Sequence, residues 1–238
     1  MDQSTHKPNH TNKRLVILTG SGISAESGIT TFRDAGGLWD NYPVMDVASI
    51  EGWYRDPELM LDFYNQRRRQ LPSVIPNQAH TGLAALEKQY DVRIITQNID
   101  DLHERAGSTR ILHLHGELTK ACSSYDKSHV ETIGTRDITW GEKARDGSQL
   151  RPFIVWFGEA VPALDQAIEW VTTADIFVII GTSLNVYPAA GLVDFVPDGC
   201  PIFLIDPNEV AKDLPKKVHV IREKAVEGVR QLSLLLPV

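Results

Sequence analysis

Seven short apolar runs, separated by stretches with helical spacing, constrain the fold of this 238-residue chain more than any other feature. They are "RLVIL" (14–18), "VRIIT" (92–96), "RILHLH" (110–115), "FIVWF" (153–157), "IFVIIG" (176–181), "PIFLID" (201–206) and "VHVI" (218–221). Several are apolar almost throughout, which is typical of strands buried on both faces of a parallel sheet. Helical spacing falls at 56–71, which opens with Asp56 and Pro57, and at 77–90 and 163–174. The alternation predicts an α/β fold with a Rossmann-like doubly wound parallel sheet.

Three segments depart from this alternation. Residues 1–13 are polar, so we expect a flexible N-terminal tail ahead of a single domain at 14–238. Residues 34–55 form a long connection with Gly36, Gly37 and four aromatic side chains, and such loops are usually functional or mobile. Residues 116–151 are mostly polar and weakly periodic, which favours a small inserted module.

Bulk composition excludes several classes of protein. A formal net charge of −7 argues against a protein that coats nucleic acid, because such proteins present a basic face. The two cysteines, Cys122 and Cys200, are too few for a disulfide framework. No apolar run approaches the roughly 18 residues that a membrane-spanning helix needs, and the N-terminus has no apolar signal-peptide core. We therefore expect a cytoplasmic enzyme.

A glycine-rich turn follows the first apolar run. "LTGSGISA" fits the dinucleotide-binding pattern Gly-x-Gly-x-x-Gly/Ala with Gly20, Gly22 and Ala25. Glycines there allow a tight turn and a close approach of the backbone to a pyrophosphate. In a dehydrogenase a second strand ends in an acidic residue about 20 residues further on, whereas here the strand that ends in an acid, at Asp206, comes far later. A dinucleotide fits the turn, but an ordinary hydride-transfer architecture does not.

Polar side chains follow two other apolar runs at the point where each strand ends. Gln97, Asn98 and Asp100 come after "VRIIT", and Thr182 and Ser183 come after "IFVIIG". Open α/β sheets bind ligands at the carboxyl ends of their strands, so both groups are candidates to bind a ribose, an amide or a phosphate. The simpler alternatives are an Asx-type turn for the first group and a helix N-cap for the second.

His113 and His115 lie two residues apart, and therefore on one face of a strand. They fit a metal pair, a general base, or one base beside a structural histidine. A metal pair would need further ligands at suitable spacing, and none is evident. Because His115 immediately precedes Gly116, where the strand leaves the sheet, it is the better candidate base.

Tyr64 and Arg67 lie on one face of the helical stretch "FYNQRRR". A tyrosine hydroxyl beside a guanidinium suits the binding of a carboxylate. Without further context, a solvated basic face explains the same residues.

Five segments, taken together and in order, resemble the sirtuin family of NAD-dependent protein lysine deacylases. They are "TGSGISAESGITTFRD", "TQNIDDLHERAG", "HLHGEL", "PFIVWFGEAVP" and "GTSLNVYPAAG". The family usually has alanine in place of Ser21, which is a small change. The resemblance implies NAD as the cofactor and acyl-lysine proteins or peptides as partners, with no role for nucleic acid or membrane. It leaves the oligomeric state and the protein targets open.

The resemblance also implies a role for each matching position. Gly20, Ser21, Gly22 and Ala25 would approach the pyrophosphate of NAD, while Phe32 and Arg33, in a cofactor-binding loop at about 32–55, would close over the nicotinamide ribose. Gln97 would contact that ribose, and Asn98, Ile99 and Asp100 would form the nicotinamide pocket. Gly181, Thr182 and Ser183 would hold the adenosine side, with Asp206 near a ribose. Val155, Phe157, Gly158 and Glu159 would line an acyl-lysine tunnel and pair with the substrate backbone as an added strand.

The implied reaction transfers the acyl group from lysine to ADP-ribose. The acyl oxygen would attack the anomeric carbon, nicotinamide would leave, and His115 would deprotonate a ribose hydroxyl, with Asn98 as the second catalytic residue. The products would be lysine, nicotinamide and O-acyl-ADP-ribose. Two alternatives use the same pocket: an ADP-ribosyltransferase or NAD hydrolase, and a non-catalytic sensor of NAD or ADP-ribose.

Three features distinguish this chain within the family. Tyr64 and Arg67 match the tyrosine–arginine pair of the desuccinylase-like branch, which implies a preference for succinyl or malonyl groups, possible together with acetyl. Most sirtuins hold a structural zinc with four cysteines after the catalytic histidine, whereas residues 116–151 contain only Cys122. We therefore predict no metal, and a module that is either held by packing through Ile138 and Trp140 or mobile. Asp206 replaces the usual asparagine, and a carboxylate can still accept ribose hydroxyl bonds.

Overall fold

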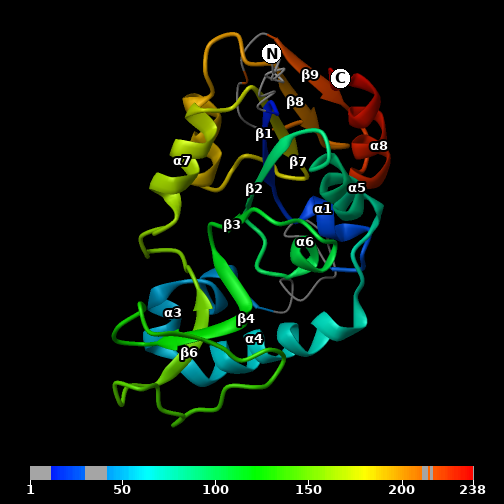
Figure 1. The fold of residues 1–238 in the computed structure, drawn as a ribbon. Helices are drawn as coiled ribbons and strands as arrows, with labels where there is room; N and C mark the ends of the chain where they lie inside the picture. Colours follow the sequence, from blue (N-terminus) through cyan, green and yellow to red (C-terminus); the bar gives the residue numbers. More distant parts are fainter. Residues whose placement is uncertain (1–11, 30–41, 211–213, 215–216, 238) are drawn as a thin grey trace, which may run out of the picture.

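A computed structural model describes residues 12–29, 42–210, 214 and 217–237. Its larger sheet has six parallel strands in the order β3-β2-β1-β7-β8-β9 (Figure 1). The strands are β1 (Arg14–Thr19), β2 (Asp91–Thr96), β3 (Ile111–His113), β7 (Ile176–Ile180), β8 (Ile202–Ile205) and β9 (Val218–Ile221). The order reverses on either side of β1, which confirms the predicted doubly wound sheet.

Helices cover both faces of this sheet. Successive side chains of β1 enter opposite cores, Leu15 and Ile17 on one face and Val16 and Leu18 on the other, because strand side chains alternate. The first core packs against α5 (Gln78–Leu86) and α8 (Ala225–Leu235), and the second against α7 (Leu164–Thr172) and the 3₁₀ segment Ala189–Phe195. Burial on both faces explains why the strands are apolar almost throughout.

A second, smaller lobe lies at the other end of the molecule (Figure 1). Its antiparallel sheet has the order β5-β4-β6 and consists of β4 (Gly116–Ser123), β5 (Val130–Thr132) and β6 (Leu150–Ile154). Its helices are α2 (Val44–Val47), α3 (Ile50–Arg55) and α4 (Pro57–Gln70), followed by the 3₁₀ turn Leu71–Ser73. Side chains from the helices and from the sheet share one apolar core, so two segments distant in sequence build this lobe together.

The structure differs from the sequence predictions in two places. The run at 153–157 was expected in the parallel sheet, but β6 ends at Ile154 and pairs antiparallel with β4. Gly116 redirects the chain there: its φ is +82°, and a Cβ would lie 2.0 Å from the Phe153 carbonyl oxygen. Part of the expected long connection is helical, because the Ser49 hydroxyl accepts from the Gly52 N–H (2.9 Å) and caps α3.

A polar cluster links the strands of the small sheet. The buried Ser123 hydroxyl on β4 hydrogen-bonds to Asp146 and to the Ser148 hydroxyl (2.7 Å), both just before β6. The same oxygen accepts from the backbone N–H groups of Tyr125 (3.0 Å) and Asp126 (2.9 Å). One hydroxyl thus ties two turns of the module to each other.

Side chains of α4 fasten the module to the helical part of the small lobe. The Asn65 amide donates to the Ile138 carbonyl (2.9 Å) and accepts from its N–H (3.0 Å). The buried Arg68 guanidinium donates to the Leu118 carbonyl (2.6 Å). Ile138 is buried as expected, whereas Trp140 is 53% exposed and touches only the edge of Trp53 among the aromatic pairs of the described residues.

Within the described ranges, no helix is long and apolar enough to cross a membrane.

Candidate active site between the sheet edge and the small lobe

The loops that follow β1, β2 and β7 meet at the carboxyl edge of the large sheet, where they border a cavity of about 870 Å³. The small lobe supplies the opposite wall. Every predicted site residue that the structure describes lines this one cavity: Gly20, Ser21, Gly22, Ala25, Tyr64, Arg67, Gln97, Asn98, Ile99, Asp100, His115, Val155, Phe157, Gly158, Glu159, Gly181, Thr182, Ser183 and Asp206. Phe32 and Arg33 lie outside the described residues. The site therefore gathers segments that are far apart in the chain.

Glycines allow the turns after β1 and β7 to cross in contact. The Gly22 N–H donates to the Gly181 carbonyl (2.9 Å), and a Cβ on Gly22 would lie 2.6 Å from the Gly181 Cα. Gly181 has φ +61°, and a Cβ there would lie 2.6 Å from the Gly22 Cα. A Cβ on Gly20 would meet the Gly181 oxygen at 2.7 Å. No side chain fits between the two turns, so these glycines are required by packing as well as by any ligand.

Hydrogen bonds hold the loop after β2 against both neighbouring turns. The Gln97 amide donates to the Thr182 hydroxyl (2.9 Å) beyond β7. The Asn98 amide donates to the Gly20 carbonyl (3.1 Å) and to the Ser24 hydroxyl (3.1 Å) beyond β1. The Asn98 N–H donates to the Thr96 hydroxyl (3.0 Å). The amides predicted to contact NAD are thus fixed before any ligand binds.

Ser24, His80 and Asp100 form a buried chain that the sequence analysis missed. The Ser24 hydroxyl donates to the Asp100 carboxylate (3.0 Å) and lies 3.5 Å from His80 Nε2. Because the Asn77 N–H donates to His80 Nδ1 (3.3 Å), that ring carries its proton on Nε2 and donates toward Ser24. Burial lowers the pKa of His80 to about 4, so its ring is neutral at pH 7. The one sequence signal was Asn77 three residues before His80, the spacing of an N-terminal capping box.

Asp100 is a buried acid at the edge of the cavity. Burial raises its pKa, while hydrogen bonds from the Leu102 N–H (3.1 Å) and the Ser24 hydroxyl oppose the rise. A carboxylate kept from water exerts a stronger field on a nearby cation than an exposed one does. The side chain is therefore placed to favour positive charge that develops in the cavity.

His115 combines a fixed tautomer with a free ring nitrogen. Its Nδ1 lies 3.0 Å from the Gln97 carbonyl, and a carbonyl only accepts, so Nδ1 carries the proton. Within the described residues, Nε2 has no hydrogen-bond partner. Burial lowers the pKa of the ring, although the bond to Gln97 opposes this shift. At pH 7 the ring is neutral and can accept a proton at Nε2, as a general base must.

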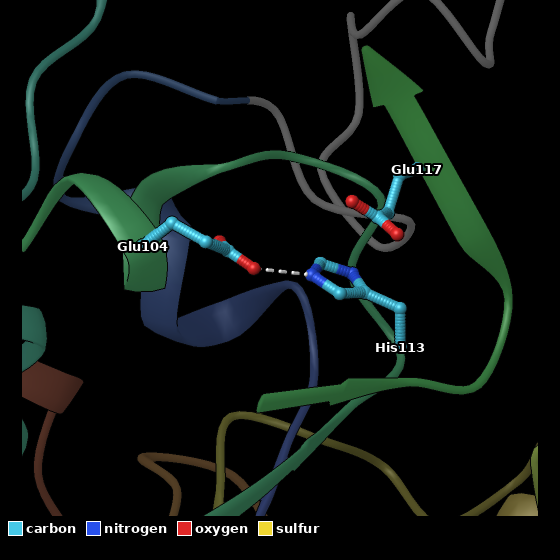
Figure 2. A group of neighbouring side chains, drawn as sticks. All are labelled: Glu104, His113 and Glu117. Atoms are coloured by element: carbon cyan, nitrogen blue, oxygen red, sulfur yellow. Dashed lines mark hydrogen bonds and ion pairs between the residues drawn. The ribbon is translucent and has the colours of Figure 1, made fainter. Parts of the chain in front are cut away.

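His113, the other histidine of the pair, is enclosed by acceptors on both sides. Its Nδ1 donates to the Asn98 carbonyl (3.0 Å), and its Nε2 lies 2.8 Å from Glu104 on α6 (Leu102–Arg105) (Figure 2). Burial disfavours the charge on His113, but the hydrogen bond and charge of Glu104 outweigh it and raise its pKa. Glu117 lies nearby and pairs with Lys120 (2.6 Å). The surroundings therefore shift the pKa values of the two histidines in opposite directions, although His115 lies only two residues beyond His113, where β3 ends.

Tyr64 and Arg67 of α4 lie on the wall of the cavity that the small lobe supplies. The buried Tyr64 hydroxyl accepts from the Trp156 indole N–H (2.9 Å), and burial raises its pKa above the usual value. The Arg67 guanidinium lies 3.4 Å above the Phe63 ring. Burial lowers the pKa of Arg67 to about 10, so the group remains cationic at neutral pH. A fixed cation thus lines a cavity whose surface is largely apolar.

The segment after β6 joins the two lobes. The Val155 N–H donates to the His115 carbonyl (2.9 Å). Phe157 pairs with 48–50 through both backbone groups, its N–H donating to the Ala48 carbonyl and its carbonyl accepting from the Ile50 N–H. Its backbone therefore already has partners, and the residue as a whole is 38% exposed.

The Glu159 side chain, like the Phe157 backbone, already has hydrogen-bond partners within the protein. Its carboxylate, 3% exposed, accepts from Arg151 (2.8 and 3.1 Å) and from the Trp156 N–H (2.9 Å). Asp206 accepts locally from the Asn208 N–H (2.9 Å) at the carboxyl end of β8. Substrate and ribose contacts for these two residues stay predictions.

The lining chemistry fits NAD. Two turns cross at the sheet edge through their glycines, hydroxyl and carboxylate groups lie on the β7–β8 side, and fixed amides with a buried acid lie on the β2 side. The volume falls in the range of small-molecule sites. Fold and site together define an α/β protein whose sheet-edge cavity suits a dinucleotide and has a neutral histidine in its wall.

Comparison with known proteins identifies the family. Residues 20–188 match the Sir2 family. An NAD-dependent protein deacylase of Bacteroides thetaiotaomicron is 58% identical over 229 residues, which cover 94% of this chain and 98% of that protein. A protein of the same name from Helicobacter pylori is 57% identical over 220 residues, covering 92% and 96%.

Solved structures agree with this assignment. A Sir2 homologue in complex with NAD is 38% identical, with a TM-score of 0.84 over 95% of this chain and 91% of that one. A Sir2 protein bound to a deacetylated p53 peptide and 3′-O-acetyl ADP-ribose is 31% identical, with a TM-score of 0.79 over 94% of each chain. The chain belongs to the Sir2 family, and the resemblance to sirtuins is confirmed.

Proposed function

We propose that this chain is an NAD-dependent protein-lysine deacylase that prefers acidic acyl groups, succinyl or malonyl, and releases nicotinamide and O-acyl-ADP-ribose. Family membership and the names of the close relatives support NAD-dependent deacylation. The roles proposed for particular side chains rest on one observation: all the predicted residues that the structure describes line the same cavity.

The nucleotide is assigned to the edge of the large sheet. Gly20, Ser21, Gly22 and Ala25 would hold the pyrophosphate, Gly181, Thr182, Ser183 and Asp206 the adenosine side, and Gln97, Asn98, Ile99 and Asp100 the nicotinamide riboside. Phe32 and Arg33 would belong to the covering loop at about 32–55. When bound, NAD supplies a reactive bond between ribose and nicotinamide. Asp100 would favour the positive charge that develops as this bond weakens.

His115 is assigned as the general base. The proton on its Nδ1 is fixed by the Gln97 carbonyl, so Nε2 presents its lone pair to the cavity. A hydroxyl placed there would lose its proton to Nε2 while the ring keeps its orientation. Asn98, anchored by the Gly20 carbonyl and Ser24, would orient the reacting groups beside this base.

Acyl-lysine would enter between the lobes beside Val155, Phe157, Gly158 and Glu159. The cation of Arg67, oriented by the Phe63 ring, would receive the terminal carboxylate of a succinyl or malonyl group. Tyr64 would contribute its hydroxyl, whose oxygen is already oriented by the Trp156 N–H. Because the surroundings are largely apolar, a neutral acyl chain can also fit, which is compatible with some deacetylation.

The proposal includes a single domain at 14–238 with an inserted module at about 116–151 that holds no structural metal. A polar cluster around Ser123 joins the turns of that module, and α4 fastens it to the lobe. A cytoplasmic location stays a prediction from the sequence.

The test is mass spectrometry of reactions with NAD and a peptide that carries acetyl-, malonyl-, succinyl- or butyryl-lysine. The proposal expects O-acyl-ADP-ribose with every accepted substrate and the highest kcat/KM for an acidic acyl group. ADP-ribosylated protein, or free ADP-ribose alone, would indicate the transferase or hydrolase alternative. Bound nucleotide without turnover would indicate a sensor.

A further inference from the structure

His113 and His115 donate to consecutive carbonyls of the same loop. His115 Nδ1 donates to the Gln97 carbonyl (3.0 Å), and His113 Nδ1 donates to the Asn98 carbonyl (3.0 Å). His113 is the last residue of β3 and His115 lies in the bend before β4, yet both rings reach the loop that follows β2. We refer to these two hydrogen bonds as the histidine clamp. It contacts the backbone on which the predicted nicotinamide pocket is built.

The second ring nitrogen of His113 shows why this residue differs from its neighbour. Nε2 lies 2.8 Å from Glu104, and the His113 side chain is only 7% exposed (Figure 2). The hydrogen bond from His113 lowers the pKa of Glu104 against the effect of burial, so Glu104 is a carboxylate at neutral pH and only accepts. With an acceptor at each nitrogen, His113 carries two protons and is an imidazolium.

The charges around His113 favour this cation. On the side of β4, Glu117 adds a second carboxylate, which Lys120 pairs with and partly offsets. Burial lowers the pKa of His103, the neighbouring ring on α6, well below its usual value, so His103 adds no competing charge at neutral pH. A charged donor forms stronger hydrogen bonds than a neutral one, so the bond to the Asn98 carbonyl gains strength from Glu104.

We propose that His113 is a positioning residue for the deacylation reaction: held by Glu104, it fixes the Asn98 peptide and so sets the Asn98 side chain beside the His115 base. This inference rests on the proposed function. Asn98 has two other kinds of anchor, its N–H to Thr96 and its amide to Gly20 and Ser24. Neither of these anchors restrains the Asn98 carbonyl, which is the group that His113 holds.

Two isosteric substitutions separate the two bonds of His113. His113→Asn places an amide near the position of Nδ1, where it can still donate to the Asn98 carbonyl but cannot reach Glu104. His113→Gln places the amide near Nε2, where it can reach Glu104 but not the Asn98 carbonyl. Both remove the positive charge and leave a polar side chain of moderate size, so each is the matched control for the other.

The measurement is kcat and KM for an acyl-lysine peptide at saturating NAD, with the melting temperature of each variant. The inference expects His113→Gln to lower kcat at least about tenfold below His113→Asn. The KM for the peptide should stay within about twofold, because His113 is not among the residues that line the cavity. Equal kcat values for the two variants, or losses that follow the melting temperatures, would overturn it.

Nuclear magnetic resonance of the ring nitrogens gives a readout that is independent of turnover. The inference expects both nitrogens of His113 to be protonated at pH 7 in the wild type, and expects Glu104→Gln to lower the pH at which His113 loses its second proton. A neutral His113 in an active enzyme would refute the inference alone. A charged His113 in a wild-type protein that does not deacylate would contradict the proposed function and leave the clamp intact.

Discussion

Replacement of Arg67 by methionine tests the proposed acyl selectivity most directly. The guanidinium stacks 3.4 Å above the Phe63 ring, so its orientation is set before substrate binds. Its pKa of about 10, lowered by burial, leaves it charged at pH 7.5. A hydrogen bond to a charged group contributes about 1.5–3 kcal/mol, which corresponds to roughly 10- to 150-fold in rate. We expect Arg67→Met to lower kcat/KM for succinyl-lysine by a factor in this range.

The assay compares succinyl- and butyryl-lysine in the same peptide. Both acyl chains have four carbons, but only succinyl carries a carboxylate, so the ratio of the two kcat/KM values isolates the charge contact from losses of folding or NAD binding. Arg69→Met is the matched control, because Arg69 is exposed on the same helix and pairs with Asp137. A succinyl/butyryl ratio within twofold of wild type in Arg67→Met, or an equal fall for both substrates, would refute the proposed contact between Arg67 and the acyl carboxylate.

Three further perturbations address the base, the glycine turns and the module. His115→Ala should lower kcat by about 10²–10⁴-fold, while NAD binding, measured by calorimetry, persists. Burial lowers the pKa of this base, so in the wild type log kcat should fall with decreasing pH only below about pH 6.5. Gly22→Ala should weaken NAD binding at least about tenfold, since its Cβ has no space, whereas Gly191→Ala, where the nearest atom is 3.8 Å away, should bind normally. Ser123→Ala should lower the free energy of unfolding by about 2–3 kcal/mol in urea titrations, and by more than Ser124→Ala does. A chelator should leave the wild-type melting temperature unchanged. Stoichiometric zinc in the purified protein would contradict the prediction that the module holds no metal.

Much of the large sheet could be predicted because its central strands are buried on both faces. Such strands need apolar side chains at every position, so β1 (Arg14–Thr19) and β7 (Ile176–Ile180) appear as continuous runs. The helix α4 (Pro57–Gln70) was equally clear, because Asp56 caps it through the Leu59 N–H (2.9 Å) and Pro57 begins it. These signals are local and reside in a few adjacent residues.

The small lobe was harder to predict because its core depends on distant contacts. The run at 153–157 is as apolar as the parallel strands, and apolar content does not distinguish a parallel partner from an antiparallel one. The helices α2 (Val44–Val47) and α3 (Ile50–Arg55) are too short for periodicity to show. In the site, Ser24 and His80 were missed because their contacts span 56 and 76 residues of sequence.

The back-to-back glycines after β1 and β7 limit how this enzyme can be re-engineered. Because Gly22 and Gly181 leave no room for a methyl group on either side, substitutions in the two turns should be strongly epistatic. A chimera that joins the N-terminal half of one relative to the C-terminal half of another would work only if both halves keep this crossing free of side chains. Combinatorial libraries aimed at altered nucleotide preference should therefore vary both turns in the same clone.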